Sequence, residues 1–189
     1  MFVAIPPRPQ RHFVWATPTL FALLWLAYVL AALHAPAGSL ATALDWGVLS
    51  GGLDSLEGWR RALADGSALR LVSALFLHAD WLHLLGNLVF LLIFGLPAER
   101  VMGGGRLLLL FLLGGAVANL AAVLAIEAPD RIIIGASGAV SALIGAYLAL
   151  LPGARLGVVL PLGLFLQFVR VPAFLLIGLW ALLQVGFAY

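Results

Sequence analysis

The sequence contains no cysteine and no lysine, and charged residues make up only 10% of its 189 residues. Without cysteine the chain cannot form disulfides and offers no thiolate to a metal. Ten basic residues, all arginine, nearly balance eight acidic ones, so the basic surplus that nucleic-acid binding needs is absent. Soluble domains are about a quarter charged. The scarcity of charge therefore argues against a fold surrounded by water.

Apolar residues supply 64% of the chain, more surface than so short a protein can hide from its solvent. We therefore predict an all-α, polytopic bundle of transmembrane helices in a lipid bilayer. Five segments are long and apolar enough, or nearly so, to cross about 30 Å of hydrocarbon. These predicted spans are Phe13–Leu33, Trp81–Leu96, Leu107–Ile126, Ser137–Leu151 and Val171–Tyr189.

Proline and glycine indicate where this pattern is interrupted. We expect Pro97 to end the second span, because proline cannot continue a helical hydrogen-bond ladder. The segment Leu156–Val169 is apolar but is broken by Pro161 and Gly163. It predicts an interfacial or re-entrant piece between the last two spans.

The arginines predict an orientation. With the N-terminus inside, the inner segments hold six of the ten arginines, in the sense of the positive-inside rule. We expect residues 1–12 to be a short cytoplasmic segment and residues 13–189 to form one membrane domain. Its long outer loop, 34–77, carries Trp46 and Trp59, which suit an amphipathic piece at the lipid headgroups.

Two polar residues lie where a membrane helix should be apolar. His83 and Asn87 are four residues apart, so they share one face of the second span. An imidazole N–H and an amide N–H₂ on one face suit the stabilisation of an oxyanion. The alternative is that they only bond neighbouring helices. His78 is five residues from His83 and is expected to point elsewhere, toward the outer loop. No metal is expected, since no H-E-x-x-H pattern or third ligand occurs.

A serine opens the fourth span. Ser137 follows Gly135 and begins a helix that would rise only about 22 Å, so its start lies below the membrane surface or inside protein. Unpaired backbone N–H groups at such a start suit a developing negative charge. The alternative is a simple helix cap. Small residues recur along this helix and would let neighbours approach closely: Ser137, Gly138, Ser141, Ala142, Gly145, Ala146 and Ala149.

In this order the motifs resemble those of the rhomboid family of intramembrane serine proteases. The resemblance covers the chain from about residue 65 onward. It rests on five stretches: Arg70-Leu-Val-Ser-Ala-Leu-Phe-Leu-His78, Trp81-Leu-His83-Leu-Leu-Gly-Asn87, Glu99-Arg100, Gly135-Ala-Ser137-Gly138-Ala-Val, and Arg170-Val-Pro172-Ala before Leu-Trp180-Ala-Leu-Leu-Gln184.

The resemblance implies a core of six helices, of which five would be present here, around a water-filled cavity. It implies Ser137 as the nucleophile, with His83 and Asn87 as oxyanion donors beside the Ser137 backbone N–H. The implied reaction is hydrolysis of peptide bonds in or near the transmembrane segments of membrane proteins, without metal or cofactor. A bacterial inner membrane is the expected location. The oligomeric state stays open.

The chain departs from the family pattern in three places. Leu69 replaces the tryptophan that usually precedes Arg70, and Ser141 stands where an aromatic residue often follows the serine. The family's general base is a histidine on a sixth helix, but no histidine follows Ser137. A serine hydroxyl needs such a base, which typically contributes about 10²- to 10⁴-fold in rate.

Three hypotheses stay open. The first is a rhomboid-type protease whose given sequence stops before its last helix, and the second is an inactive relative that binds transmembrane clients. The third is a small transporter or channel subunit, which the confinement of acidic residues to loops disfavours.

Overall fold

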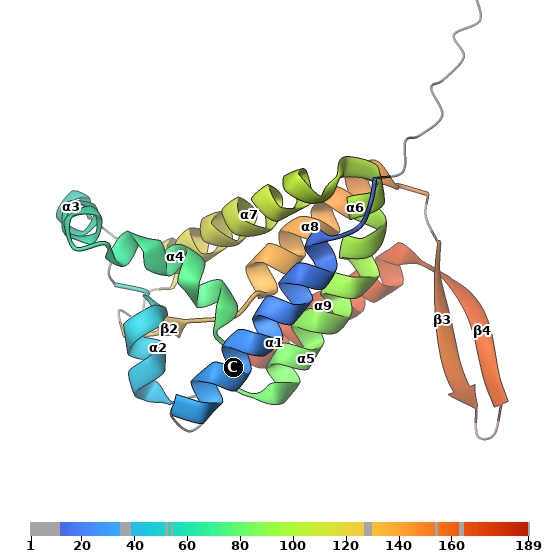
Figure 1. The fold of residues 1–189 in the computed structure, drawn as a ribbon, viewed down its shortest axis with the longest axis horizontal. Helices are drawn as coiled ribbons and strands as arrows, with labels where there is room; N and C mark the ends of the chain where they lie inside the picture. The colour runs from blue at the N-terminus through green and yellow to red at the C-terminus, as the bar shows by residue number, and fades with distance from the viewer. Residues whose placement is uncertain are drawn as a thin grey trace, which may run out of the picture.

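A computed structural model describes residues 12–34, 39–51, 53, 55–126, 130–153, 155–162 and 165–188. Apolar helices form the body of the molecule, as predicted (Figure 1). They are α1 (Ala16–His34), a continuous helix from Trp81 to Met102, α7 (Gly104–Ala125), α8 (Ser137–Leu150) and α9 (Ala173–Ala188). Within the described ranges, the first three are long and apolar enough to span a membrane, whereas α8 and α9 are shorter. The membrane-bundle prediction is confirmed.

The prediction that Pro97 ends the second span is wrong. The helix runs as α5 (Trp81–Phe90), a π-helical turn η3 (Leu91–Gly95) and α6 (Leu96–Met102), which contains Pro97 near its start. A π-turn adds one residue to a helical turn and shifts the hydrogen-bond register directly before Pro97, which donates no hydrogen bond. The helix can therefore continue through the proline. Gly103, with φ of 85°, ends the helix instead.

Small residues bring α7 and α8 into close contact, as predicted for one face of α8. A Cβ added at Gly138 would lie 2.5 Å from the Ala118 Cβ, and one at Gly114 would lie 2.5 Å from the Ala142 Cβ. Both distances are too short for real atoms, so only glycine permits this approach. Gly145, by contrast, has nothing within 4 Å of an added Cβ.

A buried carboxylate joins the start of α1 to the end of the second span. The Glu99 side chain is completely buried. Its Oε1 accepts from the N–H groups of Trp15 and Ala16 at 2.6 Å, and its Oε2 accepts from Thr17 at 2.8 Å. These N–H groups have no acceptor within α1, and the positive end of the helix dipole favours a negative charge there. Glu99 therefore caps α1 from another helix.

The outer loop folds into a layer over one end of the bundle, at the left of Figure 1. Its elements are α2 (Leu40–Trp46), β1 (Val48–Leu49), α3 (Leu56–Ala64), η1 (Ser67–Leu69), α4 (Arg70–Ser73) and η2 (Ala74–Phe76). Arg70 donates to the Leu44 carbonyl at 2.8 Å, and the Ser73 hydroxyl donates to the Trp46 carbonyl at 2.8 Å. These bonds hold α2 against α4.

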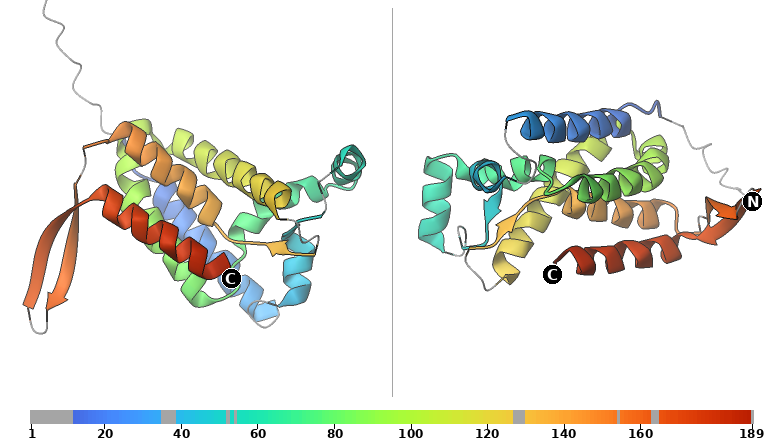
Figure 2. Two further views of the ribbon diagram at one scale, coloured as in Figure 1. Left: turned by 180° about the vertical axis from the view of Figure 1, so that it is seen from behind. Right: turned by 90° about the horizontal axis from the view of Figure 1, so that it is seen from below.

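A β-hairpin connects α8 to α9. Strand β3 (Arg155–Leu162) pairs antiparallel with β4 (Phe165–Pro172), from Arg155 opposite Pro172 to Leu162 opposite Phe165. The hairpin projects away from the helices in every view (Figures 1 and 2). The segment predicted to be interfacial or re-entrant is thus built of strands. Its position in a membrane stays a prediction, and Gly163 lies outside the described residues.

Candidate functional site

The chain that leads into α8 is pinned by backbone hydrogen bonds. Strand β2 (Ile132–Ile133) pairs antiparallel with β1, with Ile133 opposite Val48. The Gly135 N–H then donates to the Ala74 carbonyl at 2.8 Å, and the Ala136 N–H to Nε2 of His78 at 3.5 Å. Helix α8 begins at the next residue, Ser137. The start of α8 is therefore set by contacts with the outer layer.

Gly135 makes room for His83. Its φ of 111° is a conformation that residues with a side chain rarely adopt. A Cβ at this position would lie 2.8 Å from Cε1 of His83. The imidazole therefore lies directly against the turn that precedes Ser137. The structure thus places His83 against Gly135, two residues before Ser137, although the two are far apart along the chain.

The position of His83 follows from how α5 begins. The Asp80 side chain accepts from the His83 N–H at 2.8 Å and caps the helix. Asn87 lies one turn further along α5 and is almost fully buried. Its Nδ2 donates to the His83 carbonyl at 3.2 Å, and its Oδ1 is buried without a hydrogen-bond partner among the described residues. Asn87 thus bonds within its own helix, and its role as an oxyanion donor stays a prediction.

His78 lies beside His83 and also faces the outer loop, the direction expected for it, where it lines a cavity with Ser39 and Thr42. Its ring centroid lies 5.1 Å from that of His83, in an edge-to-face arrangement. Only 6% of its surface is exposed, and this burial lowers the pKa of His78 from 6.5 to about 3. The closeness of His78 to His83 was not predicted, because His78 precedes α5 and spacing along a helix does not decide where its ring lies. The signal that could have found this is Asp80, a typical N-cap residue.

A polar chain ties α9 to the first turn of α8. The Ser141 hydroxyl donates to the Ser137 carbonyl at 2.8 Å and accepts from the Trp180 indole N–H at 3.0 Å. The Trp180 ring also lies 4.6 Å from the ring of Phe90 in α5. Ser141 and Trp180 were not predicted as part of the site. A serine at position 141 replaces aromatic stacking with this hydrogen-bonded link.

The start of α8 is electrostatically open. No side chain in the described part of the molecule caps it, and its first turn holds no acidic residue. Its backbone N–H groups, together with the nearby imidazole of His83, can therefore stabilise negative charge that develops near the Ser137 hydroxyl. The other histidines lie elsewhere: His12 is beside Gly103, and Nδ1 of His34 bonds the Leu30 carbonyl at 2.8 Å.

Comparison with known proteins adds a family match. Residues 65–189 match the model of the Rhomboid domain. The chain is 35% identical over 95 residues to "Putative rhomboid protease YdcA" of Bacillus subtilis (strain 168), covering 50% of this chain and 47% of that protein. It is 35% identical over 97 residues to "RHOMBOID-like protein 5" of Arabidopsis thaliana, covering 51% of this chain and 31% of that protein.

A mammalian relative, "Rhomboid-related protein 2" of Mus musculus, is 39% identical over 80 residues, which cover 42% of this chain and 26% of that protein. The chain thus spans about half or less of the curated relatives that it matches. No solved structure matches it.

Proposed function

This chain belongs to the rhomboid family, and from that premise we propose that it is an intramembrane serine endopeptidase with Ser137 as its nucleophile. One observation carries the proposal: Ser137 is the first residue of an uncapped helix whose preceding turn contacts His83. The substrates would be membrane proteins cleaved in or near their transmembrane segments. The N-terminus would lie in the cytoplasm, as the arginine distribution favours. The membrane would be a bacterial inner membrane.

In the proposed reaction, the Ser137 hydroxyl attacks the carbonyl carbon of the scissile bond. Negative charge then develops on the carbonyl oxygen, and the Ser137 backbone N–H and the side chains of His83 and Asn87 would stabilise it. A general base must take the serine proton. If His83 acted as base it would be lost as an oxyanion donor, so we assign the base to a residue outside these 189.

A second function has its own supporting observation. No histidine follows Ser137 in the sequence, as expected of an inactive rhomboid-like protein that binds transmembrane helices without cutting them. The two functions differ in whether the Ser137 hydroxyl is activated.

The test is covalent labelling of the detergent-solubilised chain with a fluorophosphonate, which reacts with activated serines. Ser137→Ala should abolish labelling, whereas Ser67→Ala, which changes an outer-layer serine in η1, should not change it. If the chain is unlabelled, the measurement is repeated with any residues that the gene encodes beyond Tyr189 added. Absence of Ser137-dependent labelling in both forms would favour the client-binding function.

A further inference from the structure

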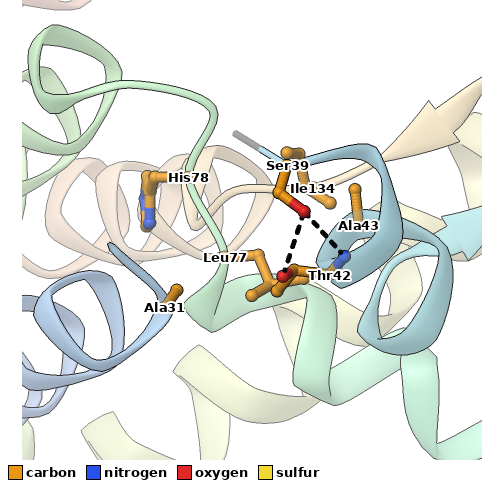
Figure 3. A pocket seen from close by; sticks show the side chains of 7 residues that line it. All are labelled: Ala31, Ser39, Thr42, Ala43, Leu77, His78 and Ile134. Carbon is orange, nitrogen blue, oxygen red and sulfur yellow. Dashed lines mark hydrogen bonds between the residues drawn. The ribbon is translucent and has the colours of Figure 1, made fainter. Parts of the chain in front are cut away.

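A small cavity adjoins His78 at the junction of α1, α2 and the segment before α5. Ala31, Ser39, Thr42 and Leu77 line it together with His78 (Figure 3). It leaves about 20 Å³ for the centre of a water molecule, and roughly 10–15 Å³ is enough to hold one water. The cavity is therefore the size of a single water molecule.

The two ring nitrogens of His78 have different surroundings. Nε2 accepts the hydrogen bond from the Ala136 N–H, so in a neutral imidazole the single proton must be on Nδ1. Nδ1 is buried and has no hydrogen-bond partner among the residues that the structure describes. The Phe76 backbone lies close enough to raise the pKa of the His78 ring, but it forms no hydrogen bond of good geometry with Nδ1. A better-placed acceptor beside Nδ1 would therefore be favourable.

We propose that the cavity binds one water molecule, which accepts a hydrogen bond from Nδ1 of His78 and is held by the hydroxyls of Ser39 and Thr42. In Figure 3 the His78 ring and the two hydroxyl groups line opposite sides of the cavity. The hydroxyls form only long bonds, with the Ser39 Oγ accepting at 3.4 Å from the Thr42 N–H and at 3.5 Å from its Oγ1. Both retain capacity for a further partner.

A route for water to enter this site is present. A wider groove of about 600 Å³ between α1 and the outer layer shares Ala31, Thr42 and Leu77 with the small cavity. The groove also contacts His34 and Ser73, so polar groups accompany the path. The shared residues separate the groove from the small cavity, so water that reaches the groove is adjacent to the proposed site.

The bound water determines the role of His78. By holding the proton on Nδ1, it keeps Nε2 free to accept from the Ala136 N–H, one residue before Ser137. His78 is then a positioning residue for the start of α8. This last step rests on the proposed function of Ser137, but the water site itself does not.

The test is nuclear magnetic resonance of the full chain in micelles at pH 7, with ¹⁵N-labelled histidine. Only four histidine signals are present, and His78→Gln identifies the one that matters. We expect the Nδ1–H tautomer for His78, with a cross-peak between this proton and water. The Nε2–H tautomer, or an Nδ1–H proton without contact to water, would overturn the proposal.

Two matched variants sharpen the result. Ala43→Val fills the cavity and should remove the water cross-peak, whereas Ala27→Val, which lines only the wider groove, should retain it. Thr42→Val removes one hydroxyl with little change of shape and should weaken the cross-peak. A cross-peak that survives Ala43→Val unchanged contradicts the assignment. Fluorophosphonate labelling is not needed, so the water site and the proposed function can fail independently.

Discussion

The first helix and the helix that carries Ser137 both begin with backbone N–H groups that no residue of their own helix can satisfy. At α1, the Glu99 carboxylate accepts three of these groups and is fully buried. At α8, no described side chain caps the helix and no acid lies in its first turn. One helix end holds a permanent negative charge and the other leaves that place free. The difference separates a structural helix start from one suited to transient charge.

The largest effect is expected from removing the Glu99 carboxylate that caps α1. Glu99→Ala leaves three buried N–H groups without acceptors, and we expect unfolding free energy to fall by about 4 kcal/mol. Glu99→Gln keeps acceptor oxygen but loses the charge, so its loss should be smaller. Unfolding in mixed micelles, followed by circular dichroism, measures both. Glu57→Ala, at an exposed acid of α3, is the control, and an equal loss there would refute the capping role.

The next largest effect is expected from removing the predicted oxyanion donors near the start of α8. Asn87→Ala or His83→Ala should slow fluorophosphonate labelling of Ser137 by about 10²-fold, or about 2.7 kcal/mol, the usual effect of losing one oxyanion donor. The matched control is Asn119→Ala, because Asn119 is also buried but donates to the Leu71 carbonyl at 2.9 Å. If Asn119→Ala slows labelling as much, general destabilisation explains the effect.

A smaller effect is expected from a substitution in the turn that precedes α8. Gly135→Ala imposes a side chain at a φ of 111° and against the His83 ring, so we expect a loss of about 2 kcal/mol in stability. Gly145→Ala changes a glycine within α8 that has open space around an added Cβ. It should stabilise the protein by up to about 1 kcal/mol. Thermal unfolding of the two variants should shift in opposite directions.

The smallest effect is expected from placing a negative charge at the start of α8, as Glu99 does at the start of α1. Ser137→Asp places a carboxylate in the first turn of α8 and should raise stability by about 0.5 kcal/mol through the helix dipole, while labelling is lost. Ser137→Asn has a similar shape without the charge and is the control. Equal stability of the two variants would show that the start of α8 does not favour negative charge.

Much of this architecture could be read from local patterns in the sequence. Apolar length predicted the five helices, and the short segment after Ser137 predicted a helix that starts within the protein. Spacing of small residues also predicted the close approach of α8 to a neighbour, which Gly138 and Ala118 confirm. These features depend on residues that are neighbours along the chain or along one helix.

The features that were missed depend on partners distant in sequence. Pro97 directly follows a π-turn, Leu91–Gly95, which no local pattern in the sequence predicted. Glu99 meets its acceptor-seeking N–H groups 82 to 84 residues away, and Trp180 meets Ser141 at a separation of 39 residues. The contact between His78 and His83 was missed because His78 precedes the Asp80 cap of α5, where spacing along a helix gives no guidance. The hairpin was ambiguous because proline and glycine interrupt helices and strands alike.

The link between Glu99 and α1 also orders events during synthesis. The chain is made from its N-terminus, so α1 is complete well before the carboxylate that caps it, which follows the capped residues by 82 to 84 positions. At about 5–20 residues per second, this delay is on the order of 4 to 17 seconds. Through that interval the first N–H groups of α1 lack their carboxylate acceptor. Its completion coincides with the arrival of the second span, so the two helices become one stable unit only together.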